Sequence, residues 1–204
     1  PKNPHTPFVI EELEVNPFAF TDYRMVPLDG LCKFSLPRAQ LQPRPIHKIK
    51  SITKPKSIGI IGVSSSRVNF GRVILKSIID AGYGKDTLYV IKPGYEEIDG
   101  VRCIPDLQAL PEPLDLFIVA VAAKQVPDLV DTILAENKVN AVMLIPGGMG
   151  ETEESKDRAM ELAEKIRAAH KAGTGPVFLG GNSMGVISRP GNYNSWFIPK
   201  EKFP

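Results

Sequence analysis

The apolar residues in the second half of the chain fall into short, nearly continuous runs separated by amphipathic stretches. Such runs are typical of strands buried on both faces of a sheet. They predict strands at Ser57–Val63, Thr87–Ile91, Leu114–Val121, Ala141–Ile145 and Val177–Leu179. The amphipathic stretches predict helices at Gly71–Ala81, Lys124–Asn137 and Thr152–Ala172, with a short helical turn at Pro105–Leu110. This alternation predicts an α/β fold, a Rossmann-like doubly wound parallel sheet of about five strands.

The first part of the chain has a different pattern. Two β-like runs, Phe8–Val15 and Met25–Cys32, predict a small N-terminal β segment within residues 1–35. Residues 36–54 combine prolines and basic residues without an apolar period, which predicts a linker. The α/β domain is then expected over 55–195, and 196–204 would begin a second linker. Because "PKNPHTPFVIEE" is no plausible start for a protein, we expect the chain to be a fragment.

Composition and charge exclude several classes of function. The hydrophobic fraction of 43% and the charged fraction of 24% are ordinary for a globular protein. A net charge of +2 gives no electrostatic case for binding nucleic acid or a membrane surface. No run approaches the ~20 apolar residues that span a bilayer. The two cysteines, Cys32 and Cys103, have no metal or redox spacing, so we expect free thiols and a cytoplasmic location.

The loop after the first predicted strand, "GVSSSRVNFG" at 62–71, is the candidate ligand site. In a doubly wound sheet, ligands lie at the carboxyl ends of the strands, and the N-terminus of the following helix favours an anion. Three serines add hydroxyl donors, and Arg67 adds a guanidinium suited to phosphate. The alternative is a polar turn that only caps the helix.

The same stretch differs from an NAD site. It keeps only the first and last glycines of the G-x-G-x-x-G pattern, and Lys92 follows the second strand where NAD sites usually carry Asp or Glu. A cation there suits an additional phosphate. NADP would tolerate the cation, but its loop normally keeps the glycines. Coenzyme A, a phosphorylated adenosine with a diphosphate and a long tail, also fits.

Further turns follow the later strands at the same predicted edge. Small residues Val121–Ala122 would let a ligand lie against the backbone, although ordinary strand-to-helix packing explains them equally well. Adjacent glycines at Pro146–Gly148 allow close approach. Glu151 is either a helix cap or a catalytic carboxylate. Asn182 either orders its Gly-Gly-Asn-Ser-Met-Gly turn or hydrogen-bonds a ligand.

Three motifs, "SIGIIGVSSSRVNFG", "YVIKPGYEEIDGVRCIPDLQALPEPLDLFIVAV" and "VFLGGNSMGVIS", together resemble the CoA-binding domain of NDP-forming acyl-CoA synthetases. This group includes the succinyl-CoA synthetase alpha subunit, and the resemblance covers about residues 55–195. Many of these relatives carry a lysine just after the proline of the second loop, whereas Lys92 precedes Pro93 here. The resemblance implies CoA contacts at Ser64, Ser65, Ser66, Arg67, Lys92, Pro93, Val121, Ala122, Pro146, Gly147, Gly148 and Asn182.

The N-terminal stretch "EELEVNPFAFTDYRMVPLDGLCKF" resembles the closing strands of an ATP-grasp domain. The resemblance implies that Asn16 and Asp29 bind Mg²⁺ in the intact domain, with Glu14 close by, and oxygen ligands of this type suit Mg²⁺. The alternative is a β-hairpin with an Asn-Pro turn.

The two resemblances imply a parent enzyme that converts acyl-CoA, NDP and phosphate into a carboxylic acid, CoA and NTP through a phosphohistidine. In that setting Glu151 would lie against the phosphohistidine. None of His5, His47 and His170 has the Gly-rich setting of that histidine, so we expect this chain to bind CoA or acyl-CoA and to catalyse nothing alone.

The expected partners are the missing ATP-grasp domain, which would use ATP or ADP, and the missing phosphohistidine domain. Self-association of the chain is compatible with the sequence. The alternatives are an NAD(P)-binding oxidoreductase domain, a non-catalytic CoA-sensing module and part of an acetyltransferase fusion.

Overall fold

The computed structural model describes residues 8–36 and 44–198. The chain divides into two compact units, residues 1–42 and 43–204, and each is described by itself.

The N-terminal unit consists of paired antiparallel strands. β1 (Val9–Val15) pairs with β4 (Gly30–Ser35), and β2 (Phe18–Thr21) pairs with β3 (Arg24–Pro27). A two-residue turn at Asp22–Tyr23, with positive φ at both positions, connects β2 to β3. These strands confirm the predicted small β segment.

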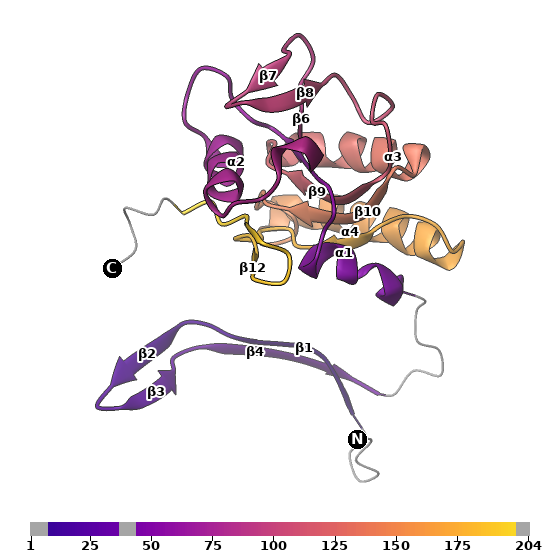
Figure 1. The fold of residues 1–204 in the computed structure, drawn as a ribbon. Coiled ribbons are helices and arrows are strands. Elements are labelled where there is room, and N and C mark those ends of the chain that lie inside the picture. The colour runs from indigo at the N-terminus through magenta and orange to yellow at the C-terminus, as the bar shows by residue number, and fades with distance from the viewer. Residues whose placement is uncertain (1–7, 37–43, 199–204) are drawn as a thin grey trace. The chain divides into compact units, whose positions relative to one another are not determined.

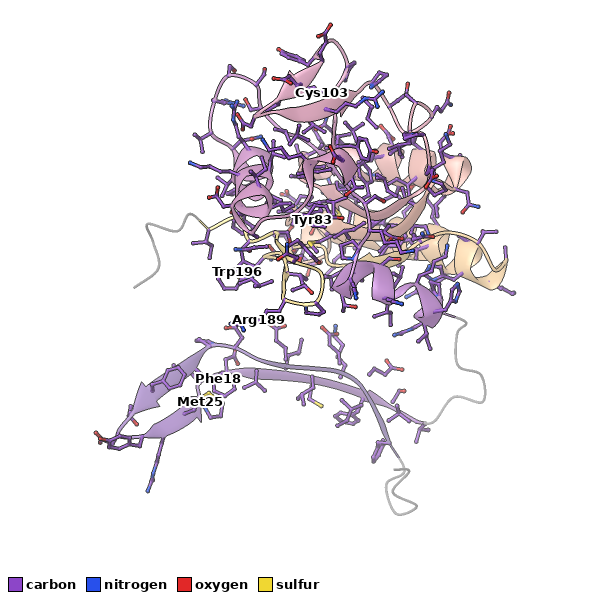
Figure 2. All side chains as sticks on the ribbon, viewed as in Figure 1. Phe18, Met25, Tyr83, Cys103, Arg189 and Trp196 are labelled. Atoms are coloured by element: carbon purple, nitrogen blue, oxygen red, sulfur yellow. The ribbon has the colours of Figure 1, made fainter. Side chains whose placement is uncertain are left out.

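The apolar side chains of this unit are largely exposed. Leu13 is 64% exposed, Phe20 79% and Phe34 63%. Side chains project from both faces of the strands in Figure 2, where Phe18 and Met25 are labelled. Residues 8–36 therefore have no buried apolar core among themselves.

The second unit is built on a seven-stranded sheet with the order β11-β10-β9-β5-β6-β8-β7. All neighbouring strands are parallel except β7, which is antiparallel to β8. The sheet confirms the predicted Rossmann-like fold, and β7 and β8 are two strands that the sequence pattern did not predict. The strands are β5 (Ile58–Ile61), β6 (Leu88–Ile91), β7 (Glu97–Ile98), β8 (Val101–Ile104), β9 (Leu114–Val119), β10 (Val139–Leu144) and β11 (Val177–Leu179).

Helices α2 (Phe70–Asp80), α3 (Val126–Glu136) and α4 (Glu153–Lys171) confirm the three predicted helices. The stretch 105–110 is a turn without helix, in which the Asp106 carboxylate accepts a hydrogen bond from the Ala109 amide. The remaining helical segments are the short α1 (Lys50–Thr53), η1 (Ile46–Lys48), η2 (Lys85–Thr87) and η3 (Ala123–Gln125).

Side chains of the central strands alternate between two buried clusters, one on each face of the sheet. Ile58, Ile60, Leu116 and Ile118 pack with α2, whereas Phe117 and Val119 pack with α3 and α4. The buried residues of α2 follow a helical period, at Gly71, Ile74, Leu75 and Ile78. α2 therefore covers one face of the sheet, and α3 and α4 cover the other (Figure 1).

Two segments outside the predicted strands and helices complete the first cluster. α1 lies in the stretch predicted as a linker, and its Ile52 packs against the cluster. The hairpin of β12 (Ile187–Ser188) and β13 (Tyr193–Asn194) buries Tyr193, whose hydroxyl donates to the Ile52 carbonyl at 2.6 Å. Burial, with a smaller effect of nearby Tyr83, raises the pKa of Tyr193 well above its usual range. Phe197 extends this packing to Phe70 of α2, with ring centroids 4.8 Å apart.

The two cysteines are free, as predicted, and lie in contrasting surroundings. Cys32 is exposed on β4. Cys103, which is labelled in Figure 2, is buried on β8. Burial raises the pKa of the Cys103 thiol. Within residues 8–36 and 44–198, every helix is too short or too polar to cross a bilayer.

Candidate functional site

The predicted site residues of the α/β unit lie on five loops that follow parallel strands. Strand order reverses at β5, because β6 pairs with one of its edges and β9 with the other. Ligands of doubly wound sheets bind at such a switch point, beyond the carboxyl ends of the strands. The loop Gly62–Asn69, which we call the serine loop, follows β5 and therefore occupies the position expected for a ligand loop.

Two glycines fix the approach of the serine loop to its neighbours. Gly62 has φ +95°, and a Cβ there would lie 2.4 Å from the carbonyl oxygen of Ala120, at the end of β9. A Cβ on Gly71, in the first turn of α2, would lie 2.6 Å from the Gly62 carbonyl oxygen. Gly62 and Gly71 are the first and last glycines of the dinucleotide-binding pattern, the two that this sequence keeps. At both positions the backbone packs directly against another backbone segment, which leaves no room for a side chain.

Asn69 caps α2 and closes the serine loop. Its side-chain oxygen accepts from the Arg72 amide at 3.0 Å and from the Ser64 amide at 3.2 Å, while its nitrogen donates to the Gly62 carbonyl at 2.7 Å. The Ser64 hydroxyl oxygen accepts from the Arg67 amide at 3.1 Å. The loop thus does cap the helix, but Asn69 makes the cap, and the Ser66 and Arg67 side chains are not used for it.

Arg67 is the exposed cation of the serine loop. Its guanidinium makes no hydrogen bond or ion pair with another residue that the structure describes. A guanidinium at a helix N-terminus, without a protein carboxylate to neutralise it, is suited to an anionic ligand.

Lys92 lies at the site but is held by the serine loop. Its ammonium donates to the Val63 carbonyl at 3.1 Å and lies 4.9 Å from the ring centroid of Tyr95. The Tyr95 hydroxyl in turn accepts from the Ser65 hydroxyl at 2.9 Å. Pro93, next along this loop, is exposed. Lys92 and Tyr95 of the β6–β7 connection therefore contact the serine loop.

The loops after β9, β10 and β11 contact one another in sheet order. Gly148 lies against η3, because a Cβ there would be 3.4 Å from the Ala123 side chain. The Asn182 amide donates to the Pro146 carbonyl at 2.9 Å. A Cβ on Gly147 would lie 3.3 Å from the side-chain oxygen of Asn182. Together with the Gly62–Ala120 contact, these contacts bring the predicted Val121–Ala122, Pro146–Gly148 and Asn182 positions to one edge.

Asn182 and Glu151 have more definite local roles than the sequence indicated. The Asn182 backbone orders its turn, at φ 56°, while its side-chain amide makes no hydrogen bond with the described residues and is free for a ligand. The N-cap of α4 is Thr152, so Glu151 is not the helix cap. Its carboxylate instead accepts from the Met149 amide at 2.5 Å and closes the Gly-Gly-Met-Gly turn. A catalytic role for Glu151 stays a prediction.

Four residues in or beside the serine loop were not among the predicted site residues: Asn69, Arg72, Tyr95 and Asp99. Arg72 donates from Nη1 to the carbonyls of Ser64 and Ser65 at 3.0 and 2.9 Å. It also donates from Nε and Nη2 to both carboxylate oxygens of Asp99, at 3.1 and 2.6 Å. The Asp-Gly pair at 99–100, flanked by alternating residues, was an available hairpin signal.

In the N-terminal unit, the predicted magnesium ligands lie at adjoining strand ends. The backbone amide of Asn16 donates to the backbone carbonyl of Asp29 at 3.2 Å. One carboxylate oxygen of Asp29 accepts from the backbone amide of Gly30 at 2.8 Å. Glu14 pairs with Leu31 across β1 and β4. Oxygen donors of this kind fit Mg²⁺, which also needs phosphate and water ligands. In the described parts of the chain, no three His, Cys, Asp or Glu side chains gather as a metal site.

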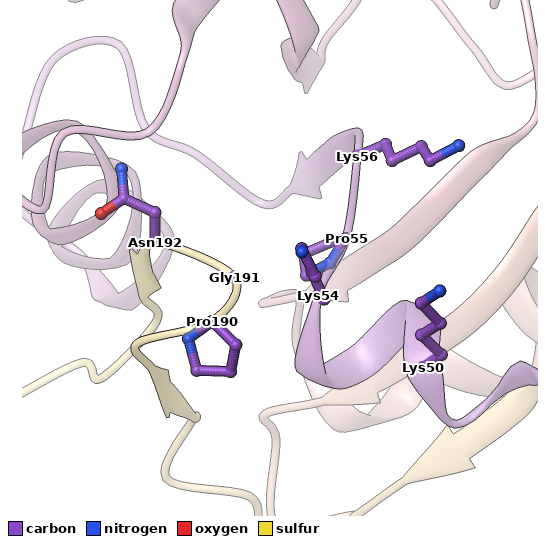
Figure 3. A pocket seen from close by; sticks show the side chains of 7 residues that line it. All are labelled: Lys50, Lys54, Pro55, Lys56, Pro190, Gly191 and Asn192. Carbon is purple, nitrogen blue, oxygen red and sulfur yellow. The ribbon is translucent and has the colours of Figure 1, made fainter.

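A separate cavity of about 290 Å³ lies at the amino end of β5 (Figure 3). It is an open hollow rather than a built site, because the lysine and asparagine side chains that line it are all exposed. Its lining residues are Lys50, Lys54, Pro55, Lys56, Pro190, Gly191 and Asn192.

Comparison with known families and sequences gives a consistent result. Residues 56–188 match the family described as CoA binding domain. The chain is 31% identical over 160 residues to the alpha subunit of ADP-forming acetate–CoA ligase I of Pyrococcus furiosus, across 76% of this chain and 33% of that protein. It is 28% identical over 153 residues to the ADP-forming acetate–CoA ligase of Methanocaldococcus jannaschii, across 74% of this chain and 20% of that protein.

Solved structures give the same fold. A Pyrococcus horikoshii OT3 protein superposes with a TM-score of 0.63 at 29% identity, covering 74% of this chain and 33% of that one. The dinucleotide-forming acetyl-coenzyme A synthetase 1 of Ca. Korarchaeum cryptofilum, at 23% identity and a TM-score of 0.61, supports the fold alone. The chain thus spans about a third or less of the length of these relatives.

Proposed function

Because the chain belongs to the CoA binding domain family, we propose that the carboxyl edge of its sheet binds coenzyme A or acyl-CoA. The domain is homologous to alpha subunits of ADP-forming acyl-CoA synthetases. The observation that carries the proposal is the serine loop at the switch point, with Arg67 free and the N-terminus of α2 directly behind it.

The serine loop suits the diphosphate of CoA. Ser66 and Arg67 are exposed and unused by the helix cap, so hydroxyl and guanidinium donors are available beside a positive helix end. The residue after β6 is Lys92 rather than an acid, which removes the usual acceptor for the ribose hydroxyls of NAD. The loops at Pro93, Val121–Ala122 and Pro146–Gly148, with Asn182, would line the rest of the ligand.

We further propose that the parent is an NDP-forming acyl-CoA synthetase and that this chain is one segment of it. Residues 1–35 would close an ATP-grasp domain, in which Asn16 and Asp29 hold Mg²⁺ beside ATP or ADP, and 36–54 would link it to the CoA domain at 55–195. Residues 196–204 would lead to a phosphohistidine domain, against which Glu151 would lie. The exposed apolar strands of the N-terminal unit support a missing partner. On this proposal the chain alone is inactive and its parent is cytoplasmic.

The first experiment is isothermal titration of this chain with CoA, NAD and NADP in one buffer. We expect CoA to bind and the dinucleotides to bind much more weakly. Arg67→Ala should weaken CoA binding by about 1.5–3 kcal/mol, the free energy of a charge-assisted hydrogen bond. The matched control is Arg189→Ala, an exposed arginine in the β12–β13 connection (Figure 2), which should leave the affinity unchanged.

The outcomes separate the competing functions. Binding of NAD or NADP without CoA would replace the proposal with an oxidoreductase domain. Unchanged CoA affinity in Arg67→Ala would remove the diphosphate assignment. Asn16→Ala should not alter CoA affinity because its proposed ligand is magnesium in another domain, and a loss there would contradict the division into two sites.

A further inference from the structure

The serine loop lacks the middle glycines of a dinucleotide-binding turn, and side chains from outside the loop bond to it. The structure shows three attachments, all to the stretch between β6 and β8. Lys92 donates to the Val63 carbonyl, Tyr95 accepts from the Ser65 hydroxyl, and Asp99 pairs with Arg72. We call residues 92–100 the brace segment.

The Arg72–Asp99 pair is the strongest of these attachments. The Arg72 guanidinium uses four of its five N–H groups, two on the carbonyls of Ser64 and Ser65 and two on the Asp99 carboxylate. A bidentate arginine–carboxylate pair fixes orientation as well as supplying energy. Side-chain exposures of 28% and 36% place the pair partly out of water, where screening is reduced. Arg72 thereby ties α2, the serine loop and the brace segment together.

Asp99 is itself held in place. It has φ +53° and begins the tight turn between β7 and β8, completed by Gly100 at φ +73°. The Lys85 ammonium donates to the Asp99 carbonyl at 2.9 Å. The carboxylate that orients Arg72 therefore belongs to a residue of a tight hairpin turn. Lys85 bonds to the backbone of Asp99, and Arg72 bonds to its side chain.

The cationic side chains at the serine loop differ in whether they already have a partner within the protein. The Arg72 guanidinium is neutralised by Asp99, and the Lys92 ammonium is directed at a backbone carbonyl and the Tyr95 ring. Arg67 alone, among the described cations of the serine loop and the first turn of α2, has neither a carboxylate nor a carbonyl partner. A ligand phosphate would thus meet a charge at Arg67 and an already paired group at Arg72.

We infer that Arg72 and Asp99 are positioning residues, which hold the serine loop in its ligand-binding shape without contacting the ligand's phosphates. This inference rests on the proposed function, because the ligand used to test it is CoA. Glycine relaxes rather than restricts the backbone. In this loop of mostly non-glycine residues, the shape is held instead by side-chain bonds from Arg72 and the brace segment.

The test compares Arg72→Ala/Asp99→Ala, which leaves the net charge unchanged, with Arg67→Ala. CoA affinity is measured by titration at 50 mM and 300 mM NaCl, across which the Debye length falls from roughly 14 Å to 6 Å. The double variant should bind CoA about 5- to 30-fold more weakly than the unaltered chain. Its CoA affinity should fall by the same factor as that of the unaltered chain when the salt concentration is raised. Arg67→Ala should also bind more weakly, but its affinity should depend less on salt.

A ligand-free measurement separates failure of the inference from failure of the proposed function. Amide hydrogen exchange at Ser64–Arg67 should be about tenfold or more faster in the double variant, while the strands β5 and β9 exchange unchanged. If the double variant does not fold, Arg72→Lys serves instead, since it also keeps the net charge and a lysine cannot make the four bonds of the guanidinium.

Each result decides a different point. Unchanged exchange at the loop would overturn the positioning role whether or not CoA binds. A double variant whose CoA affinity is unchanged would likewise overturn it. A double variant that loses salt dependence as Arg67→Ala does would make Arg72 a direct phosphate contact. Faster exchange in a chain that binds no CoA would uphold the brace and reject the proposed ligand.

Discussion

The N-terminal strands and the α/β unit contain the same kinds of apolar side chain but place them differently. In the α/β unit, aromatic and branched residues of the central strands are fully buried between helices, as Phe117 and Ile118 show. In the N-terminal unit, Phe20 is 79% exposed and Leu13 64% exposed, although both lie in hydrogen-bonded strands. Backbone pairing is therefore present in both units, but side-chain burial stabilises only one.

This difference in burial determines which unit can be stable without a partner. An isolated two-stranded pairing is marginally stable in water, because it lacks a buried face. The α/β unit buries two apolar clusters, one on each face of its sheet. Its site geometry can thus be interpreted from its own residues, whereas the strands that flank Asn16 and Asp29 have no buried face, and the magnesium site proposed there would need a covering partner.

The largest expected effect tests this difference directly with two phenylalanines. Phe117→Ala should lower the free energy of unfolding by about 3–5 kcal/mol, because it leaves a cavity in the cluster under α3. Phe20→Ala should change it by less than about 0.5 kcal/mol, since its side chain is already in water. Urea denaturation measures both. A comparable loss in Phe20→Ala would show that the N-terminal strands are stabilised by burial after all.

A smaller effect is expected from two glycines in tight and open surroundings. Gly71→Ala should lower stability by about 1–3 kcal/mol, because the added Cβ meets backbone atoms that cannot move aside. Gly30→Ala, in β4, should be tolerated, since the nearest atom to its Cβ is the Glu14 carbonyl oxygen at 3.4 Å. Thermal unfolding and CoA titration of both variants check this. If Gly71→Ala changed neither stability nor CoA affinity, the close contact between α2 and the loop after β5 would not be required for folding or binding.

The smallest expected effect concerns two tyrosines and adds a pH dependence. Tyr193→Phe should cost about 1 kcal/mol at neutral pH, because the hydroxyl donates to the Ile52 carbonyl. Burial raises the pKa of Tyr193, so its contribution is complete below the unfolded pKa of about 10 and is lost as pH rises above it. Stability above pH 10 should therefore fall less steeply in Tyr193→Phe than in the unaltered chain.

The control for this experiment is Tyr23→Phe in the exposed β2–β3 turn. Denaturation at several pH values between about 7 and 11 compares the two variants. If the free energy of unfolding fell equally steeply above pH 10 in the unaltered chain and in Tyr193→Phe, Tyr193 would not be the cause of the alkaline loss of stability.

The sequence predicted the parts of the fold that depend on nearly continuous apolar runs or on amphipathic spacing. β5, β6, β9, β10 and β11 are such runs, and helices α2 to α4 have clear amphipathic spacing. The β7–β8 hairpin was missed because charged Glu97 and Arg102 interrupt its apolar residues. α1 was missed because four residues give no helical period, and its packing depends on Ile52 meeting a distant cluster.

For the candidate site, the sequence indicated which loops meet but not what holds them. Parallel strands bring their carboxyl ends to one edge, so the loops at Ser64–Arg67 and Pro146–Gly148 could be grouped from topology alone. The pairing of Arg72 with Asp99 joins residues 27 positions apart, which no local pattern reveals. The same holds for Glu151, whose bond to the Met149 amide depends on the shape of the turn.

The contrast between the two cysteines gives the chain a selective chemical handle. A thiol-reactive dye should attach at Cys32 and spare Cys103, because a buried thiol with a raised pKa presents little thiolate to the reagent. The attached fluorophore would lie on β4, within the strands whose apolar faces are open to water. A change in its emission on adding the proposed ATP-grasp domain would then report that this domain covers those strands, without any alteration of the sequence.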